Sequence, residues 1–282
     1  MLFAVVAIPV VAAAVFFGDW ALAGLLAIAA AIGAWEYYGI ARAAGQLPIR
    51  AVGIALAAAI PLSLHARTLG VAGPSLTTGA LAVIVVCAAA IWLRAPTEKP
   101  TAAVASTIFG ALYTGGLLAF GYALRYHEYV LGQVDRRAGG ALLFFPLILT
   151  WTSDTGAYVV GRAIGRRKLA PAVSPGKTIE GALGGLALCV VVAVLYAHYV
   201  LVPWAHLAML PRSAAIFGAV VSVATQLGDL FESLIKRDSG VKDSSHLIPG
   251  HGGVLDRIDG LLFALPVAYW LLGALRIYPV PL

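Results

Sequence analysis

A polar stretch near the C-terminus holds residue types that could act on phosphate groups. In residues 233–259, basic, acidic and glycine residues crowd together, although the whole chain is 61% hydrophobic and 11% charged. Acidic side chains hold divalent cations, basic side chains bind phosphate oxygens, and glycines let the backbone approach a ligand closely. The stretch therefore predicts metal-assisted phosphate chemistry. The alternative is a solvated loop held by salt bridges.

Carboxylates flank this stretch at helical spacing. The residues before it follow i, i+3, i+4, i+7 spacing, which predicts one helix face made of Asp229, Glu232, Ser233 and Lys236. The residues after it follow i, i+3 spacing, namely Asp256 and Asp259. Two helices could therefore present carboxylates toward each other at a membrane surface. Such a geometry suits Mg²⁺, which takes oxygen ligands and keeps several waters.

A second candidate is Asp154, which lies in the apolar stretch 140–161. An ionisable residue inside a membrane span costs roughly 2.5–3.5 kcal/mol on insertion scales, so it indicates function. The alternative is that the span ends earlier and that Ser153 and Asp154 cap a second helix.

A third candidate is Lys177, in the segment Ser174–Gly181. The Gly-Lys-Thr at 176–178 resembles a P-loop only superficially, because Ala170 stands where the first glycine belongs and no strand is expected before it. We therefore reject a nucleotide-binding P-loop. Lys177 is still a candidate phosphate ligand at a helix N-terminus, where backbone N–H groups favour anions.

The elements that must position these residues are membrane helices. The mean hydropathy is +0.92, and the apolar runs lack the alternation of strands, so we expect an all-α polytopic bundle. Nine spans are expected, at about 2–17, 20–38, 51–65, 78–93, 102–124, 140–161, 180–202, 213–235 and 256–276. The third could extend toward Leu69. Five spans make an N-terminal region, 1–139, and four make a catalytic region, 140–282.

Charge distribution sets the expected orientation. The net charge is +6, which in a soluble protein would suggest nucleic acid but in a membrane protein indicates cytoplasmic loops and anionic lipid. With nine spans, thirteen of the 19 Lys and Arg residues fall on the side of the N-terminus and six on the other. We therefore expect the candidate site to face the cytoplasm of a multi-pass protein of the cell (inner) membrane. No nucleic-acid partner is expected.

The C-terminal stretch resembles the signature of the phosphatidate cytidylyltransferases (CDP-diacylglycerol synthases), S-x-φ-K-R-x₄-K-D-x-S-x₃-[PG]-G-H-G-G-φ-x-D-R-φ-D, with φ apolar. The matching residues are Ser233, Lys236, Arg237, Lys242, Asp243, Ser245, Pro249, Gly250, His251, Gly252, Gly253, Asp256, Arg257 and Asp259. The segments around Asp154, Lys177 and Asp229 are also similar. Many members carry a lysine and a tryptophan where this chain has Gly176 and Ile179. In the N-terminal half the likeness is limited to hydropathy and the Trp35-Glu36 pair. Without the resemblance, Glu36 is interpreted as an interface residue beside an aromatic belt.

The resemblance implies that CTP and phosphatidic acid react to give CDP-diacylglycerol and pyrophosphate. It implies Mg²⁺, with a monovalent cation as an option, and a homodimer. Asp229 and Asp256 are expected to bind the metal, because they lie on the two helices that frame the loop. The other expected catalytic residues are Asp259, Lys236 and Asp154. Substrate binding is expected of Lys177, Arg237, Lys242, His251, Gly252, Gly253, Arg257 and Ser233.

Two alternatives remain open at the level of sequence. One is a cytidylyltransferase that acts on another lipid phosphate. The other is a polytopic carrier that binds anionic lipid or nucleotide without chemistry. A carrier should have repeats and polar residues in both halves, whereas the polar residues here lie almost wholly after position 150.

Overall fold

The structure is a computed structural model of the 282-residue chain, and it describes residues 2–71, 73–127, 136–248, 250 and 252–280. The described part is helical, with two short antiparallel strand pairs. In chain order the elements are α1 (Leu2–Phe17), α2 (Asp19–Ala43), α3 (Arg50–Thr68), α4 (Leu76–Leu93), η1 (Pro96–Glu98), α5 (Pro100–Ala111), η2 (Leu112–Gly116), α6 (Leu117–Arg125), α8 (Arg136–Ile164), β1 (Lys168–Ala170), β2 (Ser174–Thr178), α9 (Ile179–Tyr196), η3 (Ala197–Leu201), α10 (Val202–Ala205), β3 (Leu207–Ala208), α11 (Pro211–Asp238), α12 (Leu255–Ala274) and β4 (Tyr278–Pro279).

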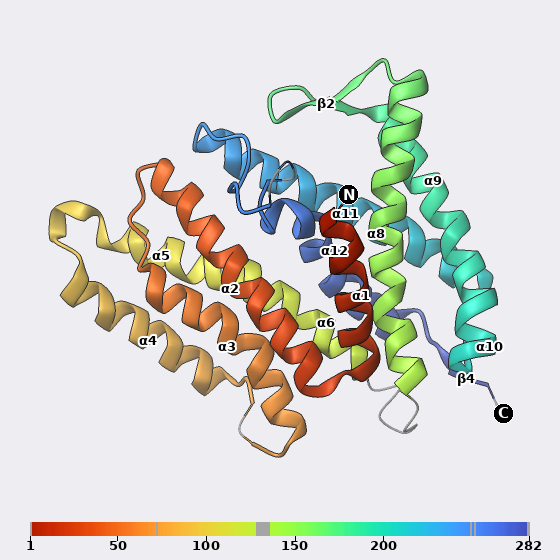
Figure 1. The fold of residues 1–282 in the computed structure, drawn as a ribbon, viewed down its shortest axis with the longest axis horizontal. Helices are drawn as coiled ribbons and strands as arrows, with labels where there is room; N and C mark the ends of the chain where they lie inside the picture. The colour runs from red at the N-terminus through yellow and green to blue at the C-terminus, as the bar shows by residue number, and fades with distance from the viewer. Residues whose placement is uncertain (1, 72, 128–135, 249, 251, 281–282) are drawn as a thin grey trace. The chain divides into compact units, whose positions relative to one another are not determined.

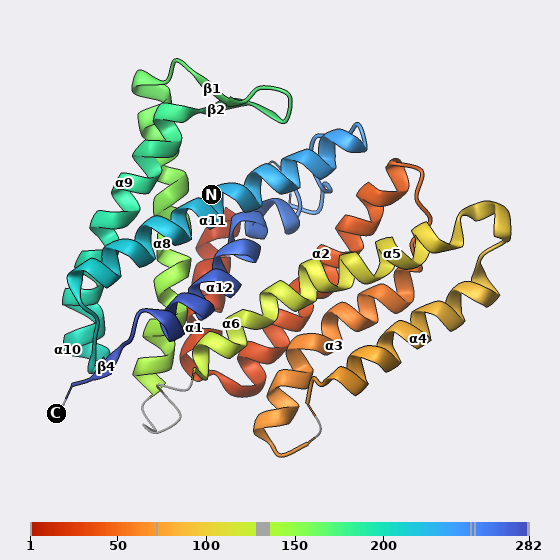
Figure 2. The same ribbon diagram turned by 180° about the vertical axis from the view of Figure 1, so that it is seen from behind.

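The chain folds into two compact units, and the first combines N-terminal helices with the polar loop. It comprises Met1–Ala14, Asp19–Tyr122 and Ile235–Ile258. Within it, α2, α3, α4 and α5 run side by side (Figures 1 and 2). Small residues allow this packing, because a Cβ at Gly53 would meet the ring of Tyr38 and one at Gly115 would meet the backbone of Ala57.

The second unit contains Val15–Gly18, Ala123–Leu234 and Asp259–Leu282. Its α8 and α9 pack along their length (Figure 1). The ring of Phe145 on α8 stacks on Tyr196 of α9, with centroids 4.6 Å apart, and on Phe217 of α11, with centroids 4.4 Å apart. The strands β1 and β2 form an antiparallel hairpin between α8 and α9, and β3 pairs with β4.

Seven described helical segments are long and apolar enough to cross a membrane. They are Asp19–Ala43, Arg50–Thr68, Leu76–Leu93, Pro100–Arg125, Ile179–Ala205, Pro211–Asp238 and Leu255–Ala274. The prediction of an all-α polytopic membrane protein is confirmed, whereas the count of nine is not. The described apolar part of α1 is shorter, and α8 is not among the seven because polar residues from Thr150 to Thr155 interrupt its apolar run.

The structure excludes one alternative and corrects one local expectation. Helix α8 continues through Ser153 and Asp154 to Ile164, so neither residue caps a second helix. The Ser153 side chain is buried and its hydroxyl lies 2.9 Å from that of Ser222 on α11, which gives it a partner inside the bundle. A strand does precede Gly176, since β1 pairs with β2, although the hairpin is far smaller than a P-loop fold.

We expect Gly185→Ala to destabilise the second unit by about 1–3 kcal/mol, because overpacking forces backbone shifts. A Cβ at Gly185 on α9 would lie only 2.6 Å from the carbonyl oxygen of Ser153 on α8. Thermal unfolding of the purified protein in detergent measures the effect. The matched control is Gly39→Ala on α2, where nothing lies within 4 Å of the added Cβ. Equal unfolding temperatures for the two variants would contradict the expectation.

Candidate active site

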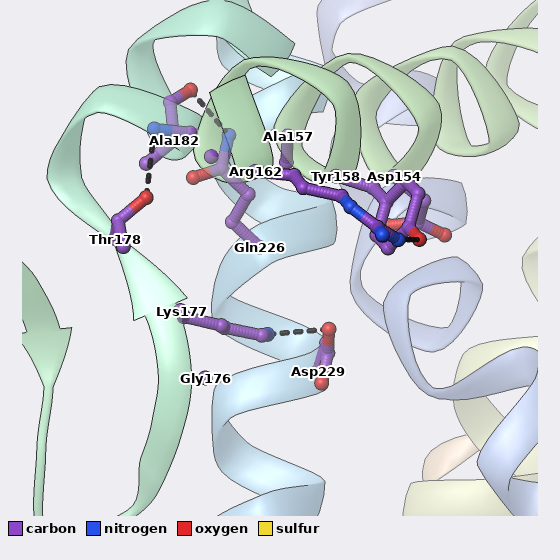
Figure 3. Close-up of a pocket in the computed structure, with 12 residues that line it drawn as sticks. Asp154, Ala157, Tyr158, Arg162, Gly176, Lys177, Thr178, Ala182, Gln226 and Asp229 are labelled. Atoms are coloured by element: carbon purple, nitrogen blue, oxygen red, sulfur yellow. Dashed lines mark hydrogen bonds and ion pairs between the residues drawn. The ribbon is translucent and has the colours of Figure 1, made fainter. Parts of the chain in front are cut away.

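A cavity of about 490 Å³ lies among α8, β2, α9 and α11, all within the second unit. Two acids and two bases are among the residues that line it, namely Asp154, Arg162, Lys177 and Asp229. Figure 3 shows these side chains pointing into a common space from three different elements. A cavity of this size with mixed charge can hold phosphate groups together with a cation.

Lys177 reaches the cavity from the end of the hairpin. It precedes Thr178, which is the N-cap of α9 and accepts a hydrogen bond from the Gly181 amide at 3.1 Å. Its ammonium group forms an ion pair with Asp229 of α11 (Figure 3). Both side chains keep contact with solvent, at 26% and 33% exposure. The pair can therefore open to a ligand without burying an isolated charge.

Glu180 fixes the hairpin against the end of α8. Its carboxylate accepts hydrogen bonds from the backbone amides of Arg166 and Arg167, at 3.0 and 3.1 Å. These bonds tie the first turn of α9 to the chain that leaves α8 and so set the position of β2. Arg166 and Arg167 themselves are exposed, which leaves Lys177 as the base that the hairpin brings to the cavity.

The α8 side of the cavity is a stripe at i, i+4, i+8 spacing. Asp154, Tyr158 and Arg162 lie together in Figure 3, and the Arg162 guanidinium donates to the Tyr158 hydroxyl at 2.7 Å. Arg162 is one of the thirteen basic residues that the charge count puts on the side of the N-terminus, and no role at the site was expected for it. The spacing from Asp154 was the signal that could have identified it, because residues four apart share a helix face.

The crossing of α11 and α12 places further acids in the second unit. A Cβ at Gly228 would lie 2.5 Å from the carbonyl oxygen of Asp259, so the two backbones touch. Asp259 is consequently close enough for the charges of Asp229 and Asp154 to act on it, and its side chain hydrogen-bonds to Glu232. The expected nearness of Asp229, Glu232 and Asp259 is present in this unit.

The polar loop of the first unit is organised around Asp256, at the start of α12. One carboxylate oxygen pairs with Lys236 Nζ at 2.6 Å. The other accepts from the Ser244 amide at 3.0 Å, the Ser244 hydroxyl at 2.8 Å and the Gly253 amide at 2.7 Å. Gly252 has a positive φ of 78°, and a Cβ there would lie 2.6 Å from the carboxylate. A residue with a side chain would strain this turn.

The remaining candidate residues are not described as gathered around one side chain in the way that Lys236, Ser244 and Gly253 surround Asp256. Ser233 is half-buried, and Arg237, Lys242 and Arg257 are exposed. His251 lies outside the described residues. Asp229 and Asp256, expected as joint metal ligands, belong to different units, and each is placed only within its own. Sequence reasoning missed the role of Glu36, which contacts the polar loop of the first unit.

The donor set has the chemistry that Mg²⁺ prefers. Among the described residues, no three His, Cys, Asp or Glu side chains are placed as a ready metal cage. Mg²⁺ is usually held by one or two carboxylates plus water and substrate phosphates, so such a cage is not required. Asp229 and Asp154 supply carboxylates at the cavity, whereas one oxygen of Asp256 already has three donors. Metal binding by Asp229 and Asp256 stays a prediction.

Comparison with known proteins identifies the family. The model described as "Cytidylyltransferase family" matches residues 1–275, so the chain belongs to that family. A phosphatidate cytidylyltransferase of Synechocystis is 30% identical over 291 residues, covering 95% of this chain and 93% of the relative.

Two further relatives match over a shorter length. The phosphatidate cytidylyltransferase of Haemophilus influenzae is 52% identical over 137 residues, 47% of this chain and 46% of the relative. The one of Bacillus subtilis is 37% identical over 159 residues, 56% of each. The matched region thus spans about half the length of these two relatives. The resemblance that the signature carries is confirmed.

Proposed function

We propose that this membrane protein is a phosphatidate cytidylyltransferase, which converts CTP and phosphatidic acid to CDP-diacylglycerol and pyrophosphate. The observation that carries the proposal is the match to the Synechocystis relative along almost the whole of both chains. The cavity with Lys177, Arg162 and Asp229 supports it, because it offers bases for phosphate oxygens and acids for a cation.

The reaction needs positioning more than acid–base catalysis. An oxygen of the phosphatidate phosphate, already anionic, forms a bond to the α-phosphorus of CTP. The bond between that phosphorus and the bridging oxygen to the β-phosphate breaks, and pyrophosphate leaves with the electron pair. The two substrates repel each other, so the protein must hold both polyanions in line and stabilise the charge on the leaving group.

Basic and acidic residues have different roles in this reaction. Lys177 and Arg162 reach into the cavity, where they can neutralise phosphate oxygens as charge-assisted donors. Lys236, Arg237, Lys242 and Arg257 supply further positive charge in the signature stretch. Mg²⁺, held by Asp229 and also assigned to Asp256, would neutralise the pyrophosphate that leaves. Asp154 lines the same cavity as Asp229 and supplies a second carboxylate that can attract a cation, and Asp259 lies near both.

A labelled-CTP assay on the purified protein in detergent tests the function and the metal together. With phosphatidic acid and Mg²⁺ we expect labelled CDP-diacylglycerol and pyrophosphate in equal amounts. Removal of divalent cations with EDTA should abolish turnover, and added Mg²⁺ should restore it. Other lipid phosphates, supplied in parallel, test the alternative substrate class. Binding of CTP without any product would favour the carrier alternative.

Lys177 and Lys242 are expected to serve different substrates. Lys177 lies beside the first turn of a membrane helix, so it should contact the phosphatidate head group, whereas the exposed Lys242 should contact CTP. Lys177→Ala should raise the apparent KM for phosphatidate more than for CTP, and Lys242→Ala the reverse. Each change should lower kcat/KM roughly ten-fold or more, since a charge-assisted contact contributes about 1.5–3 kcal/mol. Titration of both substrates with both variants measures this, and equal effects would contradict the division.

The proposal also covers the side of the membrane on which the site lies and the oligomeric state of the protein. With the nine expected spans, Lys and Arg are in excess on the side of the polar loops, and this distribution supports a cytoplasmic site, where CTP is available. Phosphatidate reaches that site from the bilayer. A homodimer is the expected assembly, and light scattering in detergent tests it.

A further inference from the structure

Glu36 is a buried carboxylate in the middle of an apolar helix. It lies on α2 with 1% exposure, and the surrounding span Asp19–Ala43 is apolar enough to cross a membrane. A charge at such a depth is costly unless several donors surround it. Its donors among the residues that the structure describes come from one place, the segment 244–255, more than 200 residues later in the chain.

The two carboxylate oxygens of Glu36 bind both arms of the polar loop, namely residues 244–245 and residues 254–255. From the first arm they accept the hydroxyls of Ser245 at 2.6 Å and Ser244 at 3.3 Å. From the second arm they accept the backbone amides of Val254 at 2.9 Å and Leu255 at 2.6 Å. Leu255 is the first residue of α12 and Val254 directly precedes it, so both amides lie at the N-terminus of the helix, where an anion is favourable.

The same contacts reach Asp256 through shared neighbours. The Ser244 hydroxyl lies within hydrogen-bond distance of both Glu36 and Asp256. Asp256 follows Leu255 directly, so the amide that Glu36 fixes sets the start of the helix that carries Asp256. Gly253 sits between them, and a Cβ there would overlap the Ser244 hydroxyl and the Glu36 carboxylate. No side chain fits at this position without opening the loop.

We propose that Glu36 is a positioning residue for the signature loop, which locks Ser244 and the N-terminus of α12 so that Asp256 and Lys236 keep their paired geometry. The proposal rests on the proposed function for its kinetic part. Glu36 is buried, and its carboxylate is bonded to the polar loop of its own unit. Its effect should therefore appear in turnover and in the KM for CTP, which Lys242 of the same loop is expected to contact, and not in the KM for phosphatidate.

The test uses Glu36→Gln, which keeps the size of the side chain but replaces an acceptor oxygen with a donor. The variant must then lose at least one of the two hydrogen bonds that Glu36 accepts from backbone amides. We expect kcat per folded molecule to fall about 10- to 100-fold, because small misplacements of reacting groups have effects of this size. The apparent KM for phosphatidate should stay within about three-fold, whereas the apparent KM for CTP should rise. Glu98→Gln is the matched control, since the Glu98 carboxylate accepts the Ala95 amide in an exposed turn.

A second measurement reads the loop directly. A nitroxide at Leu247→Cys, a residue with 51% exposure, reports the mobility of the loop. The exposed Cys87 is first replaced by Ser, and Cys189 is buried and stays. Glu36→Gln should mobilise the nitroxide, and Glu98→Gln should not.

Both readouts must change for the proposal to stand. An unaltered kcat per folded molecule overturns it, and so does a nitroxide of unaltered mobility. Failure of the proposed function is recognised separately, because the unsubstituted protein would then make no CDP-diacylglycerol while the nitroxide would still report the loop.

Discussion

Replacing Asp229 with Asn should lower kcat/KM for CDP-diacylglycerol formation by about 100- to 1,000-fold, the usual effect of removing one strong electrostatic contact from an active site. The amide keeps the shape of the side chain but loses the charge that faces Lys177 and would hold Mg²⁺. The fold should survive, because both members of the pair are partly exposed. Exposed ion pairs contribute only about 0–1 kcal/mol to stability.

The labelled-CTP assay and thermal unfolding in detergent measure the two effects. Asp238→Asn is the matched control, since Asp238 is an exposed carboxylate at the end of the same helix. It should leave both activity and unfolding temperature unchanged. Near-normal turnover of Asp229→Asn with Mg²⁺ would remove Asp229 from the catalytic set.

Asp256→Asn should reduce activity by a similar factor, and it should also destabilise the protein. The side chains of Asp256 and Lys236 are 7% and 11% exposed, so this pair is far more enclosed than Lys177 and Asp229. Removing one member of a buried pair costs about 3–5 kcal/mol, because the other charge stays in a poor solvent. Asparagine keeps a single acceptor oxygen, so it can serve either Lys236 or the Ser244 and Gly253 amides, but not both.

Lys236→Met and the double variant complete a thermodynamic cycle. Each single change should lower the unfolding temperature, whereas the double variant should lose less stability than the two losses combined. Additive losses would mean that the ion pair does not contribute to stability. Comparing Asp256→Asn with Asp229→Asn gives a clearer test, because both variants should lose activity but only Asp256→Asn should also lose stability.

Much of the fold could be predicted from hydropathy. The expected spans 51–65 and 102–124 correspond to α3 and to the α5–η2–α6 segment, because apolar run length sets the length of a membrane helix. The turn of π-helix at Leu112–Gly116 has no such signal. Neither has the hairpin Lys168–Thr178, whose few residues form a strand pair through backbone bonds rather than through an apolar pattern.

The site was predictable where its residues are close in sequence. The helix-face spacing around Asp229 and the signature around Asp256 identified the groups, but the contacts between distant segments were not accessible. Lys177 and Asp229 are far apart in the chain, and Glu36 is farther still from Leu255. Such pairs form through helix packing and cannot be identified from a single sequence.

The Glu36 contacts have a consequence for the order in which the chain is made. Helix α2 leaves the ribosome early, whereas the Leu255 amide that it holds is synthesised 219 residues later. Until then the nascent N-terminal helices contain a carboxylate without its donors, and the signature loop has no anchor. Contacts this distant form late and slowly. The polar loop can therefore acquire its native arrangement only when insertion of the chain is nearly complete, and a prematurely terminated product cannot be active.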